Sequence, residues 1–332
     1  MGARVSDRRR IALALVGCGA VAERFHAPAL RRIEEIDVRA VVDVDPARRQ
    51  RMRRRFPRAE AYGSVAELPG DIEAALVAVP NALHAPLCIE LFQRGVHVLC
   101  EKPMATTVDD CERMLKAATE AGAALSVGHH KRFLPSVRKA KQLLEEGRLG
   151  RIRRVTASMG LPWSWPSRSG FYSDRARAGG GVLLDTGIHL IDLVLWLLGP
   201  IRDLRYYGLP TGQPIEQEAK LEVWMACGAT GVLRCSHRRV LPNLFRVEGE
   251  KGFLEFDTYD YPVLKVFIAG TALARERGSV ALTWPRGNPF REQLQQFLRR
   301  VHGEEGSGVN AEEAMEAVSV ATAAYAGQAG ST

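Results

Sequence analysis

A glycine-rich turn near the start of the chain constrains the fold more than any other feature. The segment GCGAVA, residues 17–22, has the spacing G-x-G-x-x-A and directly follows the apolar residues 11–16. The first glycine permits a tight bend, the second lets the backbone approach a pyrophosphate, and the small third residue allows a helix to pack closely on a strand. The N–H groups of the following helix favour the phosphate charge. The residues expected to contact a dinucleotide here are Gly17, Gly19, Ala20 and Val21.

An acidic residue at the end of the next apolar stretch supports this interpretation. Asp43 follows residues 38–42, about 20 residues beyond the turn, where a carboxylate accepts hydrogen bonds from ribose hydroxyls and repels a 2′-phosphate. The sequence therefore favours NAD over NADP. NADP stays possible, because Arg48 and Arg49 are close enough in sequence to hold a phosphate. Asp45 precedes a proline and is expected to cap a helix.

The order of apolar and helical patterns predicts two domains. Near-continuous apolar stretches alternate with helical patterns up to residue 128, which is typical of a doubly wound parallel sheet: 11–16, 38–42, 74–79, 96–100 and 124–127. After residue 128, consecutive strand patterns indicate mostly antiparallel pairing. We expect an α/β Rossmann domain over residues 1–128 and an α+β domain with a large, mostly antiparallel open sheet over residues 129–332.

Composition excludes several other classes of protein. The chain is 46% hydrophobic and 25% charged, as in ordinary globular domains. The longest apolar stretch, residues 182–198, is interrupted by Asp185, His189 and Asp192, so no membrane span is expected. The apolar residues after the basic N-terminus lead into the glycine turn rather than a cleavage site, which argues against a secretory signal. Six cysteines without a C-x-x-C pair or zinc spacing indicate free thiols in the cytoplasm and no metal site.

The positive charge of the chain does not indicate nucleic acid as a partner. The formal net charge is +8, and 38 of the 46 basic residues are arginine, which suggests a general arginine bias. Residues 48–58 are the densest cluster, and a solvated helix face explains them best. A contribution to binding an acidic ligand remains open, and no nucleic-acid-binding motif accompanies the cluster.

Several motifs, taken in order, resemble one enzyme family. A lysine in Glu101-Lys102-Pro103 follows the fifth apolar stretch, at the edge of the sheet where such folds bind ligands. Together with the glycine turn, four motifs cover nearly the whole chain: Val79-Pro80-Asn81 with His84, Glu101-Lys102-Pro103, Arg132-Phe133, and GGGVLLDTGIHLIDLVLWLLG at residues 179–199. In this set the chain resembles the Gfo/Idh/MocA family, which includes glucose–fructose oxidoreductase and inositol dehydrogenase.

The resemblance implies roles for particular residues. Lys102 would be catalytic, with a cis bond to Pro103, although a surface lysine paired with Glu101 is the alternative. His189 would be the general acid or base, and Asp185 would orient or polarise it or contact a substrate hydroxyl. Asp185, His189 and Asp192 can share one face of a helix, and without the resemblance a structural histidine would be favoured. The residues implied to line the cofactor site are Pro80, Asn81, His84, Glu101, Lys102 and Pro103.

Substrate contacts are predicted from position and residue type. The resemblance places Arg132 near substrate and nicotinamide, with His130 beside it, although relatives often carry asparagine at that position. Aromatic rings stack on sugars, so Trp163, Trp165 and Tyr172 are further candidates. Packing explains the tryptophans equally well.

The main hypothesis is an NAD(P)-dependent oxidoreductase that transfers a hydride between nicotinamide and a secondary hydroxyl or ketone of a sugar, sugar derivative or cyclitol. Lys102 and His189 would handle the proton. Two alternatives remain: a redox-neutral glycoside hydrolase that uses NAD transiently, and a dinucleotide-binding regulator without catalytic activity. The resemblance also implies a homodimer or homotetramer that assembles through the open sheet.

Overall fold

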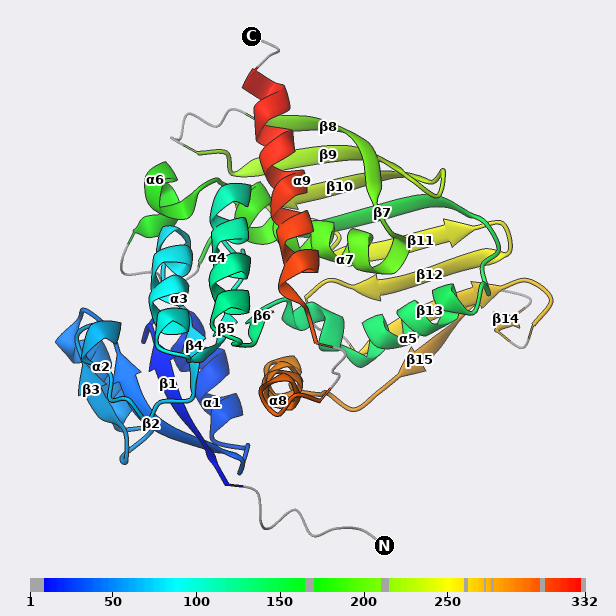
Figure 1. Ribbon diagram of the computed structural model, residues 1–332. Helices are drawn as coiled ribbons and strands as arrows, with labels where there is room; N and C mark the ends of the chain where they lie inside the picture. The colour runs from blue at the N-terminus through cyan, green and yellow to red at the C-terminus, as the bar shows by residue number, and fades with distance from the viewer. Residues whose placement is uncertain are drawn as a thin grey trace, which may run out of the picture. The chain divides into compact units, whose positions relative to one another are not determined.

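The computed structural model describes residues 9–164, 170–209, 215–259, 262–271, 273–275, 278–304 and 308–329. The chain forms two compact units (Figure 1). The first comprises residues 1–105, 109–128 and 290–312, and the second comprises residues 106–108, 129–289 and 313–332. Each unit is built around its own sheet.

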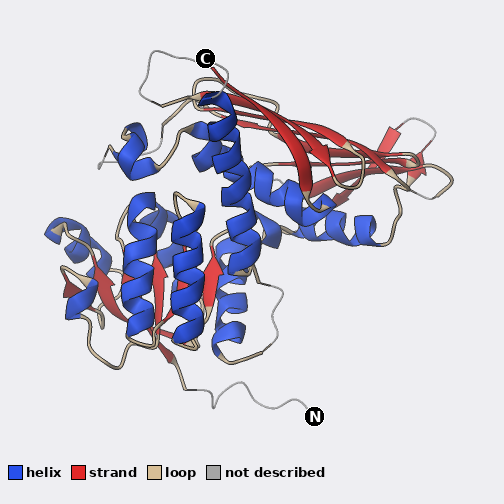
Figure 2. Cartoon of the chain, turned by 45° about the horizontal axis from the view of Figure 1, so that its top comes forward, coloured by secondary structure: helices blue, strands red, loops and turns tan. Residues whose placement is uncertain are grey.

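The sheet of the first unit is entirely parallel, as predicted. Within the described residues its strand order is β3-β2-β1-β4-β5-β6. Every residue of β1 and β4 is buried, since helices lie against both faces of the sheet (Figure 2). The strands are β1 (Ile11–Val16), β2 (Ile36–Val42), β3 (Glu60–Tyr62), β4 (Ala74–Val77), β5 (His97–Cys100) and β6 (Leu125–Val127).

The helices of this unit follow the strands in turn. The helix after β1 contains a π-helical turn, η2 (Ala22–His26), before α1 (Ala27–Leu30). Asp45 caps α2 (Pro46–Arg53) as expected, because its carboxylate accepts the N–H groups of Ala47 and Arg48. The remaining helical segments before the second unit are η3 (Val65–Glu67), η4 (Asn81–Leu83), α3 (His84–Gln93) and α4 (Val108–Glu120).

A late helix, α8 (Pro289–Val301), belongs almost entirely to the first unit. Its buried side chains pack with β1, β2 and α1 in one hydrophobic cluster. One of them, Phe290, stacks on Phe25 with ring centroids 4.9 Å apart. The first unit is therefore discontinuous in sequence, since residues of the second unit separate α8 from the rest of it. The sequence analysis had placed α8 in the second domain.

The sheet of the second unit is large and mostly antiparallel, as predicted. In the described part of the chain nine strands follow the order β14-β15-β13-β12-β11-β7-β10-β9-β8, and only β7 and β10 pair in parallel. The strands are β7 (Ile152–Gly160), β8 (Ile201–Leu209), β9 (Glu218–Met225), β10 (Thr230–Ser236), β11 (Leu244–Gly249), β12 (Gly252–Asp257), β13 (Val263–Ile268), β14 (Ala274–Arg275) and β15 (Gly278–Thr283).

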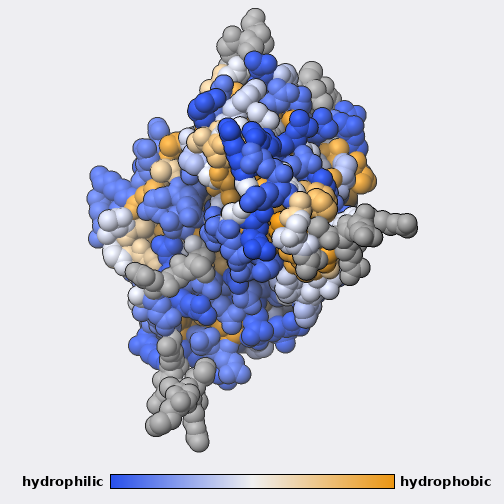
Figure 3. All heavy atoms as spheres, turned by 90° about the vertical axis from the view of Figure 1, so that its right-hand side faces the viewer, coloured by the Kyte–Doolittle hydropathy of each residue, from blue (hydrophilic) through white to orange (hydrophobic). Residues whose placement is uncertain are grey.

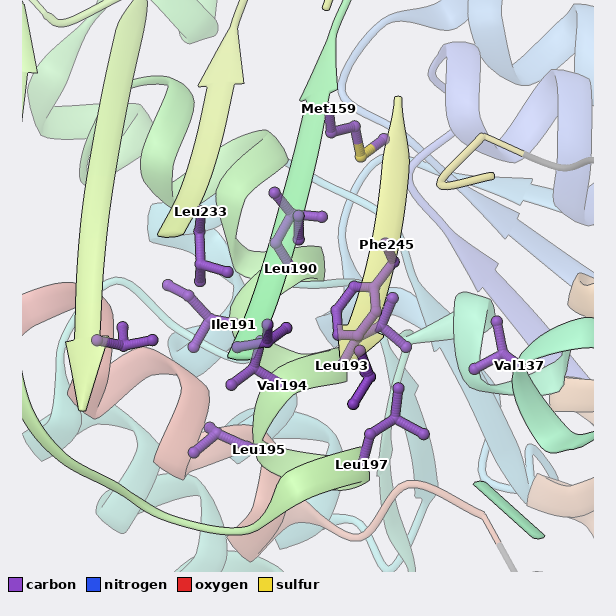
Figure 4. Close-up of a cluster of buried hydrophobic side chains, with 14 of the residues drawn as sticks. Val137, Met159, Leu190, Ile191, Leu193, Val194, Leu195, Leu197, Leu233 and Phe245 are labelled. Carbon is purple, nitrogen blue, oxygen red and sulfur yellow. The ribbon is translucent and has the colours of Figure 1, made fainter. Parts of the chain in front are cut away.

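One face of this sheet packs on helices. Burial alternates along β9, so every second side chain faces the core. Side chains of α7 (Ile188–Leu198) meet this face, and Ile191, Val194, Leu233 and Phe245 lie in one cluster (Figure 4). The other helical segments are η5 (His130–Phe133), α5 (Pro135–Glu145), η6 (Phe171–Ser173), α6 (Arg175–Ala178), η7 (Leu183–Gly187) and α9 (Ala311–Ala329).

The apolar helical segment Arg175–Leu198 is long enough to cross a membrane by length and composition. However, 83% of its most apolar window is buried inside the protein. It is a core helix of the second unit. The side of the molecule drawn in Figure 3 is mostly hydrophilic, with apolar residues in small groups, as on an ordinary globular surface.

Candidate active site

The glycine turn has the geometry that a dinucleotide requires. Gly17 has a φ of +90°, and a Cβ there would lie 2.2 Å from the carbonyl oxygen of Ala78, so only glycine fits. Gly19 is different, because a Cβ built on it meets no atom within 4 Å. Protein packing therefore does not explain the glycine at position 19, whereas close approach of a phosphate does. The residues of the turn fit the predicted cofactor.

Asp43 is attached to this turn by its side chain. One carboxylate oxygen accepts the N–H of Cys18 at 2.8 Å, and the other accepts the N–H of Asp45 at 2.9 Å. A carboxylate has about four acceptor positions, so two hydrogen bonds leave capacity for ribose hydroxyls. Arg49 donates to the backbone carbonyl of Asp43, and Arg48 pairs with Asp45 at 3.3 Å. Arg49 therefore lies beside Asp43, whereas Arg48 lies beside Asp45.

Lys102 is the second residue after β5 and lies between two well-anchored neighbours. The bond from Lys102 to Pro103 is cis, as the family resemblance implied. Glu101 is buried, and its carboxylate accepts the backbone N–H of Lys102 at 3.1 Å. The other oxygen of Glu101 lies 2.6 Å from Nε2 of His26. The lysine thus sits at the carboxyl edge of the parallel sheet, in the same unit as the glycine turn.

His84 lies too deep to contact a ligand. Its ring is fully buried, with Nδ1 2.7 Å from the carbonyl oxygen of Pro103 and Nε2 3.0 Å from that of Val79. Burial lowers the pKa of His84, although the two carbonyls and Glu101 oppose that shift. His84 can therefore shape a cofactor site only through the backbone. Pro80, four residues earlier, is only half-buried and is better placed for direct contact.

In the second unit, Asp185 pairs with a histidine that the sequence analysis did not select. Its carboxylate lies 3.2 Å from Nε2 of His237, which also lies 2.9 Å from the hydroxyl of Thr186. His237 comes from the end of β10. Asp185 lies in a π-helical turn, residues 183–187, rather than in the regular α-helix that the sequence pattern suggested. π-helical turns are frequent at functional sites.

His189 lies among other histidine rings. It is 6% exposed, and its ring meets that of His130 at a centroid distance of 5.2 Å and that of His129 at 6.4 Å, both edge-on. Nδ1 of His129 is 3.6 Å from a carboxylate oxygen of Asp192.

No group of three or more potential ligands suited to a metal ion occurs in the described part of the chain.

Arg132 makes contacts that account for its charge without a substrate. It is buried, and its guanidinium donates to Asp192 from Nε at 3.1 Å and from Nη2 at 2.6 Å. It also pairs with Glu313 and lies over the ring of Trp196. Burial opposes the charge, but the two carboxylates raise the pKa of Arg132 above its ordinary value. These contacts hold η5 to α7, and in them Asp192 has a structural role.

An aromatic group lies beside the Asp185–His237 pair. Trp163 is 42% exposed. Its ring centroid is 4.3 Å from that of His237 and 4.7 Å from that of Tyr172. An exposed indole next to polar side chains suits stacking on a sugar. Trp165 lies outside the described residues.

Comparison with known families decides the classification. A profile described as "Oxidoreductase family, NAD-binding Rossmann fold" matches residues 11–129, and the GFO/IDH/MocA C-terminal domain matches residues 137–255. The chain belongs to the Gfo/Idh/MocA family. Its first unit is an NAD-binding Rossmann domain.

Several relatives of this Gfo/Idh/MocA protein have names that describe enzymes of sugar chemistry. A putative UDP-kanosamine synthase oxidoreductase subunit of Amycolatopsis mediterranei is 33% identical over 64% of this chain and 58% of that protein. A 1,5-anhydro-D-fructose reductase of Ensifer adhaerens is 40% identical over 41% of each. The match thus spans about half the length of these two relatives. The structure of aldose–aldose oxidoreductase from Caulobacter crescentus, complexed with glycerol, has a TM-score of 0.85 at 26% identity, covering 98% of this chain and 99% of that one.

Two side-chain contacts in this Gfo/Idh/MocA chain were not predicted from its sequence. His26 and His237 contact Glu101 and Asp185, respectively, from elements distant in sequence. A carboxylate alone cannot indicate which histidine of the chain will reach it. One signal was available for His237, because it follows an alternating strand pattern and begins a polar loop.

Proposed function

We propose that the chain is an NAD(P)-dependent oxidoreductase that transfers a hydride between nicotinamide and a carbon bearing a secondary hydroxyl or ketone. The observation that carries this proposal is the position of Lys102. It follows β5 at the carboxyl edge of a parallel sheet, in the unit that also contains the glycine turn and Asp43. Ligands of such sheets bind at this edge. The family and the names of its relatives support a sugar, sugar derivative or cyclitol as the substrate.

A nicotinamide cofactor held by the glycine turn and Asp43 would supply the hydride chemistry. The ammonium of Lys102 donates a hydrogen bond to the substrate oxygen and stabilises negative charge as the hydroxyl loses its proton. His189 accepts that proton during oxidation and returns it during reduction. Asp185, held by His237, accepts a hydrogen bond from a neighbouring hydroxyl of the substrate.

The preferred cofactor in this proposal is NAD. The carboxylate of Asp43 is hydrogen-bonded to the turn at Cys18, and its charge would repel a 2′-phosphate there. The proposed cofactor contacts in the turn are Gly17, Gly19, Ala20 and Val21. Beyond the turn, Pro80, Asn81, Glu101, Lys102 and Pro103 complete the proposed set.

The second unit would supply the substrate contacts. Trp163 and Tyr172 are proposed to stack on the sugar ring, since the ring of Trp163 contacts those of Tyr172 and of His237, the partner of Asp185. We also propose a cytoplasmic homo-oligomer. The absence of disulfides among the six cysteines, all within the described chain, is consistent with a reducing compartment.

The test is the absorbance of reduced nicotinamide after mixing the protein with NAD⁺ or NADP⁺ and a panel of inositols, aldoses, uronates and nucleotide sugars. We expect an increase with NAD⁺ that Lys102→Ala lowers by about 100-fold or more. Lys116→Ala is the matched control, because Lys116 is an exposed lysine of α4 in the same unit.

Two other outcomes would contradict the proposal. Glycoside cleavage without a net change in nicotinamide absorbance would indicate the redox-neutral hydrolase. Cofactor binding with no turnover of any compound in the panel would indicate the regulator. Equal activity of Lys102→Ala and Lys116→Ala would remove the role assigned to Lys102.

A further inference from the structure

The segment Glu101-Lys102-Pro103 is held at both ends by buried histidines. On one side, Nε2 of His26 lies 2.6 Å from the carboxylate of Glu101, which in turn accepts the N–H of Lys102 at 3.1 Å. On the other side, Nδ1 of His84 lies 2.7 Å from the carbonyl oxygen of Pro103. The residues before and after the lysine are therefore both fixed by imidazole rings.

His26 brings the helix of the glycine turn into contact with Glu101. It is the last residue of the π-helical turn η2 and is only 1% exposed. Its Nδ1 has no hydrogen-bond partner among the described residues, so a neutral ring carries its hydrogen on Nε2 and donates it to Glu101. The ring also meets Phe290 edge-on at 5.1 Å, which restricts its rotation.

The absence of a side chain at Gly128 makes room for the carboxylate of Glu101. A Cβ added at Gly128, just after β6, would lie 3.1 Å from the carboxyl carbon of Glu101. A larger residue at position 128 would therefore crowd the carboxylate in its observed position. Glu101 is only 8% exposed, so its hydrogen bond with His26 forms in a site of low dielectric, where such a bond is strong.

His84 anchors the opposite end through the start of α3. Its two nitrogens face the carbonyl oxygens of Pro103 and Val79, and the ring has no exposed surface. A neutral imidazole has one N–H to donate, and the shorter contact assigns it to Pro103. This ring thus joins the chain after Lys102 to the chain after β4.

We propose that His26 and His84 are positioning residues for Lys102. Neither ring is exposed enough to touch a substrate, so both act through the backbone on either side of the lysine. Displacement of a catalytic group by about 1 Å can reduce a rate about 100-fold, which makes such anchoring important. Because His26 belongs to the helix of the glycine turn, the same contact fixes the lysine relative to the predicted phosphate site. The inference rests on the proposed role of Lys102.

The experiment compares variants that keep or remove the hydrogen-bond donor. His26→Gln places an amide N–H near the position of Nε2, whereas His26→Leu fills the space without a donor. For His84 the matching pair is His84→Asn, whose amide approximates Nδ1, and His84→Leu. The exposed His302→Leu, at the end of α8, is the control. Thermal unfolding identifies any variant that is not folded.

We expect the leucine variants to lose about 10- to 100-fold in kcat, with the KM for the cofactor changed less than threefold. The glutamine and asparagine variants should recover kcat to within about fivefold of the parent. A structural role alone would lower stability without this difference between donor and non-donor variants. Leucine variants with the kcat of the parent would overturn the proposal, and so would equal losses in both members of each pair.

A second measurement does not depend on turnover. Hydrogen exchange of the Lys102 amide, followed in the protein without added ligand, reports the contact to Glu101 directly. We expect faster exchange in His26→Leu and nearly unchanged exchange in His26→Gln. If the parent protein has no oxidoreductase activity, the proposed function fails, and this measurement alone decides whether His26 positions Lys102. Equal exchange in the parent and His26→Leu would overturn the inference.

Discussion

Histidines of this chain perform different tasks because their surroundings differ. His237 lies beside a carboxylate, whereas His84 is enclosed between carbonyl oxygens. His97, at the start of β5, accepts the N–H of Ala124 at Nδ1 with a distance of 2.9 Å. A nitrogen that accepts a hydrogen bond carries no proton. Burial lowers the pKa of His97, and His302 adds to this effect while Glu73 opposes it.

This gives His97 a defined contribution to stability as a function of pH. Its pKa in the folded protein lies below the ordinary value near 6.5, so the unfolded chain takes up a proton first. The contribution of His97 to the free energy of unfolding is complete above about pH 6.5 and is lost as the pH falls toward the pKa of His97 in the folded protein. Because the ring is partly exposed, this loss is less than about 1.4 kcal/mol per pH unit. His97→Asn retains an acceptor but cannot titrate.

Urea unfolding of both proteins between pH 5 and 7.5 tests this expectation. The free energy of unfolding of the parent should decrease with falling pH more steeply than that of His97→Asn. His84 also titrates below its ordinary pKa, and this shared contribution cancels in the comparison. Parallel pH profiles would show that His97 makes no such contribution.

At the scale of elements, three consecutive glycines allow the core helix to begin where it does. Glu216 accepts the N–H of Leu183 at 3.2 Å through its side chain and that of Val182 at 3.0 Å through its carbonyl. A Cβ on Gly181 would lie 2.2 Å from that carbonyl oxygen. Tyr325, in α9, donates to Glu216 at 2.7 Å and accepts the N–H of Gly181. The glycine thus makes room for the group that caps the helix.

Gly181→Ala should therefore destabilise the protein by about 1–3 kcal/mol, through steric overlap and loss of the cap. Gly70→Ala is a suitable control, because a Cβ at Gly70 meets no atom within 4 Å. Chemical denaturation measures the free energy of unfolding of both variants. The two values can be compared directly if the dependence on denaturant concentration is the same for both. The same stability for Gly181→Ala and Gly70→Ala would mean that the helix start tolerates a side chain.

The sequence predicted strands well where apolar residues are continuous, as in β1 and β4. It missed β3, Glu60–Tyr62, because an exposed edge strand of three residues has no hydrophobic pattern. The π-helical turn before α7 was not foreseeable from periodicity, so the partner of Asp185 was not foreseeable either. Local motifs pointed to Gly17 and Asp43, and the family resemblance implied the cis bond at Lys102. The histidines that contact Glu101 and Asp185 depend on tertiary packing.

For the whole molecule, the six cysteines provide a test of whether the two units unfold together or separately. Five are buried, and Cys227 is exposed. Burial raises the pKa of Cys18 and Cys111 to about 12, so these thiols also resist ionisation. The buried set divides between the two units: Cys18, Cys88, Cys100 and Cys111 in the first, and Cys235 in the second.

In the native protein we expect a single fast reaction with a disulfide reagent at pH 8, and Cys227→Ser should abolish it. The other thiols should react only as their surroundings open. Mass spectrometry of each cysteine over time, at increasing urea, would show whether Cys235 becomes labelled together with the other four or separately. Rapid labelling of more than one cysteine without urea would contradict the burial described here.

The position of α8 has a consequence for how the chain acquires its structure during synthesis. The first unit emerges from the ribosome early, but part of its core, Leu294 and Phe297 included, is translated only after the whole sheet of the second unit. Until then the surface against which α8 packs lacks its cover, and nascent chains with exposed apolar surface are prone to aggregate. The dinucleotide-binding unit is thus the first to begin folding and cannot be the first to finish.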